Sequence, residues 1–159
     1  MSGQYLRLME LRLAGPGLRR LRCLALGLAL CWTAGGARAA DLVVIVSARA
    51  PVTALRADQV ADIFLSEANR FPDGSEAVAV DQSIGSPVRD EFYEKIAHRS
   101  PALMKAYWTK MIFTGRGQPP REAGGNAAVR KLVADNPGMI GYIERGALDP
   151  SVRPVLMVR

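Results

Sequence analysis

The chain has 159 residues, enough for one domain, and it carries 21 basic and 15 acidic side chains. Six of the basic residues and one of the acids lie in the first forty positions, which leaves 15 basic and 14 acidic residues beyond them. That remainder is close to neutral, so its charge does not favour a nucleic-acid partner. Cys23 and Cys31 also lie in the first forty positions, and we therefore expect no disulfide or thiol chemistry in the rest.

Residues 1–39 have the order of a secretory signal peptide. A basic stretch comes first, an apolar run from Cys23 to Ala34 follows, and Ala37-Arg38-Ala39 is a small-x-small cleavage site. The apolar run is too short to span a bilayer comfortably. We expect cleavage after Ala39 or one residue later, a periplasmic product and no membrane insertion after cleavage. A general export route is favoured, and Arg19-Arg20 leaves the twin-arginine route open.

The remainder, residues 41–159, begins with alternating strand and helix patterns. Residues 42–46 are a continuous β-branched apolar run, typical of a strand buried on both faces. Residues 55–65 repeat apolar side chains at helical spacing, and residues 76–80 alternate as a strand does. A Phe-Pro-Asp-Gly turn at residues 71–74 separates them.

Two predicted helices begin with the same Ser-Pro pair, a favoured cap followed by a favoured first helical residue. Ser86-Pro87 begins a helix that reaches about residue 97, and His98, the only histidine, lies at its end as a C-terminal capping group. Ser100-Pro101 begins the next helix. Its aromatic and methionine stripe is predicted to be core: Leu103, Met104, Tyr107, Trp108 and Met111.

Residues 114–121 are rich in glycine and proline and are predicted to be irregular. They form either a linker or a lip that carries Thr114 and Arg116 toward a cleft, and the sequence leaves both open. A further helix follows with Asn126 as its N-cap. Residues 139–143 then form a strand whose Gly141 marks a bulge or a close approach of backbone or ligand, and residues 152–158 form the last strand.

The start of the helix at Ser86-Pro87 is the best candidate for a binding site. Arg89 stands at the third helical position, where a capping box would place Glu or Gln and where a cation opposes the helix dipole. Free N–H groups, a serine hydroxyl and a guanidinium converge there, which indicates an anion site. On the local pattern alone, an ordinary Ser-Pro helix start with a solvated arginine is favoured over an anion site. Ser47 and Arg49, after the first strand, are weaker candidates.

Several segments in this order resemble the phosphate-binding, substrate-binding proteins of bacterial ABC transporters. The segments are Val60-Ala61-Asp62-Ile63-Phe64-Leu65, then Gly85-Ser86 with Phe92, then Gly125-Asn126, and finally residues 137–144, Pro-Gly-Met-Ile-Gly-Tyr-Ile-Glu. The last is the most specific, because this family typically has Gly-x-Ile-Gly-Tyr-Val-Glu there. The resemblance implies an α/β, periplasmic-binding-protein-like domain over residues 41–159, with a mixed sheet flanked by helices. The chain resembles a shortened form of this two-lobed, type II family.

The chain departs from the family's pattern at the implied site. The family usually has an arginine where Gln82 stands, and a glycine where Pro87 stands. Proline has no N–H to donate, so two of the family's donors are replaced. The Gly-rich loop of the family's first lobe also has no counterpart before residue 55.

The resemblance implies a solute-binding protein for phosphate or a similar small oxyanion, with an ABC permease as partner. The implied ligand-binding residues are Ser47, Gly85, Ser86, Arg89, Thr114 and Arg116, and Asp81 is the nearest acceptor for a proton on phosphate. No catalytic set, metal cluster or cofactor motif is present in the sequence, so we expect no enzyme. The alternative is a reduced, ligand-poor interaction or sensory module of the same fold, which the altered donors favour.

Overall fold

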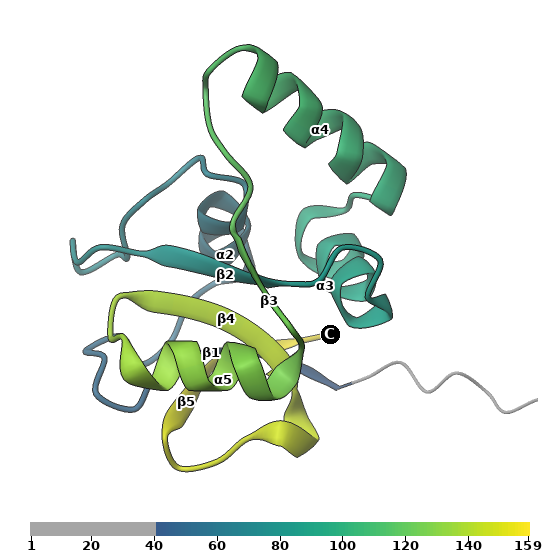
Figure 1. The fold of residues 1–159 in the computed structure, drawn as a ribbon. Helices are drawn as coiled ribbons and strands as arrows, with labels where there is room; N and C mark the ends of the chain where they lie inside the picture. Colours follow the sequence, from purple (N-terminus) through teal and green to yellow (C-terminus); the bar gives the residue numbers. More distant parts are fainter. Residues whose placement is uncertain (1–40) are drawn as a thin grey trace, which may run out of the picture. The chain divides into compact units, whose positions relative to one another are not determined.

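The computed structural model describes residues 41–159, and the signal-peptide prediction for residues 1–39 lies outside them. Strands and helices alternate along the described chain, which confirms the predicted α/β class (Figure 1). The elements in chain order are β1 Leu42–Ser47, α2 Ala57–Phe64, β2 Val78–Gln82, α3 Pro87–Ala97, α4 Pro101–Phe113, β3 Arg121–Ala123, α5 Asn126–Asp135, β4 Met139–Glu144, the short helix η1 Arg145–Ala147 and β5 Val152–Val158.

The five strands form one mixed sheet in the order β3-β2-β4-β1-β5. β2 runs parallel to both β3 and β4, whereas β1 is antiparallel to both β4 and β5. The carboxyl ends of β2 and β4 therefore lie at one end of the sheet, and the carboxyl end of β1 lies at the other. This arrangement decides which of the predicted site residues can meet.

Helices cover both faces of the sheet. α5 packs on one face, and α2 and α3 pack on the other (Figure 1). The central strand β1 is fully buried, with Leu42, Val44 and Val46 packed in the cluster under α2 and α3. Val43 and Ile45 face α5. The predicted strand buried on both faces is confirmed.

Gly141 lies in the middle of β4, where α5 comes close to the sheet. A Cβ added to this glycine would lie 2.5 Å from Val129 Cγ1 and 3.1 Å from Val133 Cγ2. The first separation is too short for any real side chain, so only glycine lets α5 pack this closely. The close approach predicted from the sequence is found, and the neighbour is a helix of the same chain.

Three local predictions need correction. Gly125, with φ 97°, caps α5, and Asn126 is the first helical residue, because only glycine readily adopts this backbone conformation. β2 begins two residues later than predicted and ends at Gln82. The segment predicted to be irregular leads into β3, which pairs in parallel with β2 over three residues. A three-residue strand carries too little pattern to be recognised from sequence alone.

The predicted core stripe of α4 is only half buried. Met104 and Trp108 are buried, but Leu103 is 56% exposed. α4 packs chiefly against α3, on the side away from the sheet (Figure 1). Tyr107 and Met111 are partly buried and pack against the core, so Leu103 is the one residue of this stripe that lies in solvent.

Candidate functional site

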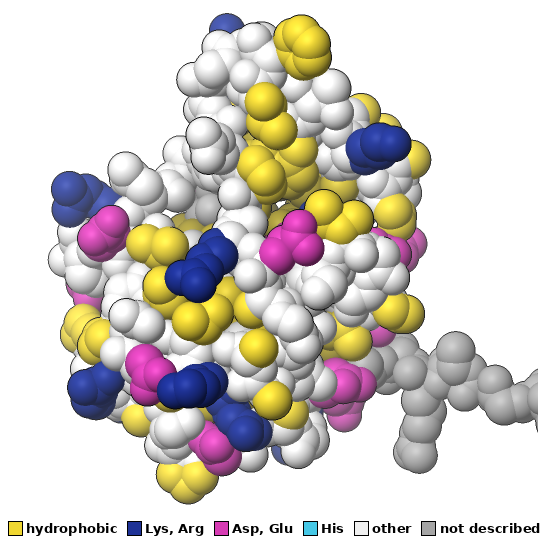
Figure 2. All heavy atoms as spheres, viewed as in Figure 1, with side chains coloured by type: hydrophobic (Ala, Val, Ile, Leu, Met, Phe, Trp, Pro, Cys, Tyr) yellow, Lys and Arg dark blue, Asp and Glu magenta, His cyan; other side chains and the backbone are white. Residues whose placement is uncertain are grey.

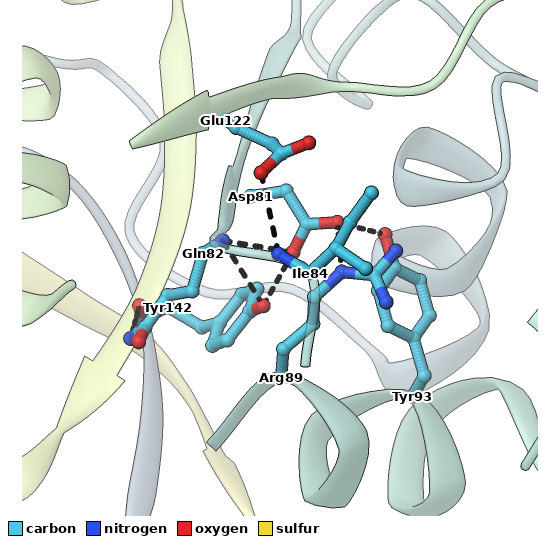
Figure 3. Close-up of polar contacts among 7 residues, drawn as sticks. All are labelled: Asp81, Gln82, Ile84, Arg89, Tyr93, Glu122 and Tyr142. Atoms are coloured by element: carbon cyan, nitrogen blue, oxygen red, sulfur yellow. Dashed lines mark hydrogen bonds and ion pairs between the residues drawn. The ribbon is translucent and has the colours of Figure 1, made fainter. Parts of the chain in front are cut away.

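A buried carboxylate at the end of β2 holds the start of α3 (Figure 3). Asp81 is 2% exposed, and its Oδ2 accepts hydrogen bonds from Arg89 Nε and from the Tyr93 hydroxyl, both at 2.9 Å. Its Oδ1 accepts from the Tyr142 hydroxyl and from the Gln82 N–H. Four donors therefore satisfy this carboxylate, as a buried charge requires.

The electrostatics of this cluster favour the charged form of Arg89 and the neutral form of the two phenols. Burial disfavours the charged guanidinium of Arg89, but the adjacent Asp81 more than offsets this effect and raises the pKa of Arg89. Burial raises the pKa of Tyr93 and of Tyr142 well above the usual value, and the negative charge of Asp81 raises both further. Both tyrosines therefore remain hydrogen-bond donors throughout the physiological pH range.

Arg89 is buried, 6% exposed, so the alternative prediction of a solvated arginine is wrong. Its Nε is used by Asp81, and its Cζ lies 4.9 Å from the centre of the Tyr93 ring. Within residues 41–159, no hydrogen bond is made by its two terminal nitrogens. The side chain can therefore offer a ligand only these terminal nitrogens. Asp81, considered from the sequence as a proton acceptor for phosphate, has its carboxylate enclosed by protein donors and does not face a ligand.

The start of α3 has the geometry of a helix end with an open cap. Ser86 is the N-cap with extended φ and ψ, but its side chain makes no capping hydrogen bond. Gly85 before it has φ 84°. The neighbouring Ile84 N–H donates to Glu122 Oε2 at 3.2 Å. Glu122 comes from β3 and was not predicted for this site, because only the pairing of β3 with β2 brings it here.

Gln82, which stands where the resembled family has an arginine, is part of the scaffold. Its Nε2 donates to Asn126 Oδ1 at 3.0 Å and to the Tyr142 carbonyl at 3.3 Å. Asn126 Nδ2 in turn donates to Glu144 Oε2 at 2.5 Å. The Gln82 side chain thus ties β2 to α5 and β4 and does not project from the helix start.

The six predicted ligand-binding residues fall in separate places. Gly85, Ser86 and Arg89 lie together at the start of α3. Ser47 is fully buried at the carboxyl end of β1, where its Oγ donates to the Ala134 carbonyl at 3.1 Å. Because β1 runs against β4 and β2, Ser47 lies at the opposite end of the sheet from the start of α3.

The remaining two predicted residues follow α4. Thr114 is exposed, and its hydroxyl donates to the Lys110 carbonyl one turn back. Arg116 is exposed and lines a depression with Tyr107 and Arg99, on the side of α4 that faces α2. Neither residue lines the groove beside the start of α3.

That groove, of about 570 Å³, runs between the start of α3 and α4. Figure 2 shows hydrophobic side chains gathered in a hollow beneath α4. The residues that line the groove are Ile84, Gly85, Arg89, Asp90, Pro101, Ala102, Lys105, Trp108, Thr109, Ile112 and Pro119. The sequence stripe on α4 singled out Trp108, but nothing in the sequence indicated that α3 and α4 enclose a groove.

Among residues 41–159, no group of three or more His, Cys, Asp or Glu side chains is placed to hold a metal ion. In the same part of the chain, no helix is long and apolar enough to cross a bilayer.

Several solved structures match this fold. A protein assigned as a phosphate ABC transporter substrate-binding protein, from Clostridium perfringens and with bound phosphate, matches 73% of this chain at 25% identity and a TM-score of 0.57. The chain shares the fold of phosphate ABC transporter substrate-binding proteins. Two further matches show the fold alone: an ABC-type phosphate transport receptor from Vibrio cholerae (19% identity, TM-score 0.58) and PstS from Borrelia burgdorferi (15% identity, TM-score 0.54), each over 73% of this chain.

The chain corresponds to only part of these substrate-binding proteins. It covers 44% of the Clostridium structure, 45% of the Vibrio structure and 46% of the Borrelia structure. No protein-family model matches the sequence, and no curated protein matches it.

Proposed function

We propose that this chain is an exported solute-binding protein that captures phosphate or a similar small oxyanion for an ABC-type uptake system. The observation that carries the proposal is the match at 25% identity to a substrate-binding protein with bound phosphate. The proposal includes a signal peptide over residues 1–39, a periplasmic location and an ABC permease as partner. Its mechanism is capture without catalysis.

The proposed contacts lie at the start of α3. Ser86 Oγ has no capping bond to break and donates to the anion, together with free N–H groups of the first turn. Gly85 admits close approach, and the terminal nitrogens of Arg89 add charge-assisted hydrogen bonds. Pro87 contributes no N–H, and Glu122 opposes an anion beside Ile84. Binding to this part of the chain is therefore expected to be weak.

Calorimetry with inorganic phosphate and with sulfate tests the proposal, using the purified protein at low ionic strength. Ser86→Ala should weaken phosphate binding about tenfold or more, because a hydrogen bond to a charged group is worth about 1.5–3 kcal/mol. Glu122→Gln should tighten it a few-fold, because it removes a like charge near the anion. Arg89 is unsuitable for this test, since its removal leaves Asp81 buried without its cation.

Ser100→Ala is the matched control, because Ser100-Pro101 begins α4 as Ser86-Pro87 begins α3. This variant loses a helix cap but should bind phosphate as the wild type does. Absence of heat at millimolar phosphate with folded protein would overturn the proposal. An equal loss of affinity in Ser86→Ala and Ser100→Ala would show that the loss does not come from a contact between Ser86 and the ligand.

A reduced interaction or sensory module of the same fold is the second candidate. The observations that favour it are the scaffold role of Gln82, the proline at the first helical position and the pairing of Arg89 with Asp81. This module would keep the fold and bind a protein where the first candidate binds an anion. Folded protein that binds neither phosphate nor sulfate supports it.

A further inference from the structure

We propose that the oxyanion bound here carries an apolar group, as an organic phosphonate or a phosphate monoester does, and that the groove between α3 and α4 holds this group. The inference rests on the proposed function, because it extends the same anion site. The groove measures about 570 Å³ and is lined by Gly85, the residue directly before Ser86. That volume suits an organic ligand and exceeds what inorganic phosphate fills.

The walls of the groove are apolar and leave large side chains in solvent. Ile84, 72% exposed, lies on the α3 side, and Ile112, 55% exposed, lies on α4. Trp108, on α4, also lines the groove. Exposed aliphatic side chains that line a groove are stabilised when an apolar group displaces the water against them.

Trp108 adds a donor without an acceptor. Its indole Nε1 is buried, the residue is 6% exposed, and no acceptor among residues 41–159 bonds to this nitrogen. Buried indole N–H groups normally find a partner, so an orphan beside a groove points to an acceptor supplied from outside.

The charges along the lining favour an anion that still carries a proton. Arg89 and Lys105 supply two cations, and Asp90 supplies one carboxylate. A carboxylate repels a fully ionised ligand but accepts a hydrogen bond from a P–OH group. Phosphate monoesters have a second pKa of about 6, so about a tenth of the ligand is monoprotonated at pH 7 and about half at pH 6. This combination separates phosphorus oxyanions from sulfonates and carboxylates.

The test compares methylphosphonate and phenylphosphonate by calorimetry, because the two share a headgroup and differ in the apolar part. Phenylphosphonate should bind about tenfold tighter, because its ring enters the groove. Ile112→Ser should remove most of this gain and leave methylphosphonate binding unchanged. Leu103→Ser is the matched control, since Leu103 is equally exposed on α4 but does not line the groove.

Tryptophan fluorescence gives a second readout. Once the proposed signal peptide, which contains Trp32, is removed, Trp108 is the only tryptophan, and phenylphosphonate should shift its emission. Methylphosphonate should shift it less, because it leaves the groove empty. Absence of any shift during saturable binding of phenylphosphonate would place its ring elsewhere and overturn the inference.

The possible failures are distinguishable. If methylphosphonate and phenylphosphonate bind equally and both depend on Ser86, the inference falls and the proposed function stands. If neither phosphonate binds to the folded protein and inorganic phosphate does not bind either, both the inference and the proposed function fall. If benzyl alcohol binds as tightly as phenylphosphonate, the groove takes an apolar ligand without a headgroup, and the inference falls. Sedimentation that gives a dimer, with Ile112→Ser monomeric, would show that a second copy fills the groove instead.

Discussion

Asp81 is the residue through which β2, β4 and the start of α3 are held together. It accepts hydrogen bonds from side chains on α3 and β4, and it pairs with the cation that the sequence suggested for the ligand. A buried pair of this kind contributes little net stability, but loss of one partner is costly. The same contact therefore limits how freely Arg89 can serve an anion.

The two tyrosines of this cluster predict a loss of stability at alkaline pH. Burial and the charge of Asp81 raise the pKa of Tyr93 and of Tyr142 in the folded state, whereas an unfolded tyrosine titrates near 10. Above pH 10 the unfolded chain loses protons that the folded chain keeps, so stability falls as pH rises. Each tyrosine should contribute about 1.4 kcal/mol per pH unit.

Urea unfolding at several pH values between 8 and 11 checks this expectation. The phenylalanine of Tyr93→Phe cannot ionise. The stability of this variant should therefore fall less steeply with pH than that of the wild type, and the difference should equal the contribution of one tyrosine. Any lower stability of this variant at neutral pH does not affect the test, because the test compares the slopes of the free energy of unfolding against pH. If the wild type and Tyr93→Phe have the same slope above pH 10, Tyr93 ionises as easily in the folded state as in the unfolded state, which would contradict the expectation.

At the scale of elements, the packing of α5 on β4 depends on a single missing side chain. Gly141→Ala should destabilise the fold by about 2 kcal/mol, because its Cβ would lie 2.5 Å from Val129 Cγ1. Gly146→Ala is the matched control, since an added Cβ there meets nothing within 4 Å. That variant should stay within about 0.5 kcal/mol of the wild type. Chemical denaturation measures both, and an unchanged Gly141→Ala protein would contradict the close packing.

At the scale of the whole molecule, burial is uneven between the sheet and α4. β1 is buried over its full length, whereas α4 has two buried side chains and exposes Leu103, Ile112 and Phe113. Few apolar contacts hold α4 to the rest of the described chain. Local opening of α4 therefore requires less free energy than unfolding of the sheet.

Hydrogen exchange under native conditions should separate these two regions. Amides of α4 should exchange through local opening, well before those of β1, whose exchange requires global unfolding. Sub-denaturing urea should accelerate exchange in β1 more than in α4, because global unfolding exposes more surface. Equal protection in α4 and β1 would show that the outer helix unfolds together with the sheet.

The sequence by itself determined the features that depend on neighbours along the chain. The run at residues 42–46 predicts its own burial because successive side chains must face opposite sides of a sheet. The Ser-Pro pairs at Ser86 and Ser100 predict where α3 and α4 begin, since helix caps are local. Gly141 predicts a bulge or a close approach of backbone or ligand, because a glycine inside a strand otherwise weakens it. The α/β class follows from the order of these patterns.

Only the tertiary structure decided what these elements do together. The reversed direction of β1 puts Ser47 far from Ser86, and the pairing of β3 with β2 brings Glu122 to the start of α3. Arg89 pairs with Asp81 because strand and helix meet there. Trp108 lies beside the groove because α4 packs on α3. The spacing of apolar residues shows which side of a helix or strand is apolar. It does not show which other element packs against that side, because the contacting segments are far apart in the sequence.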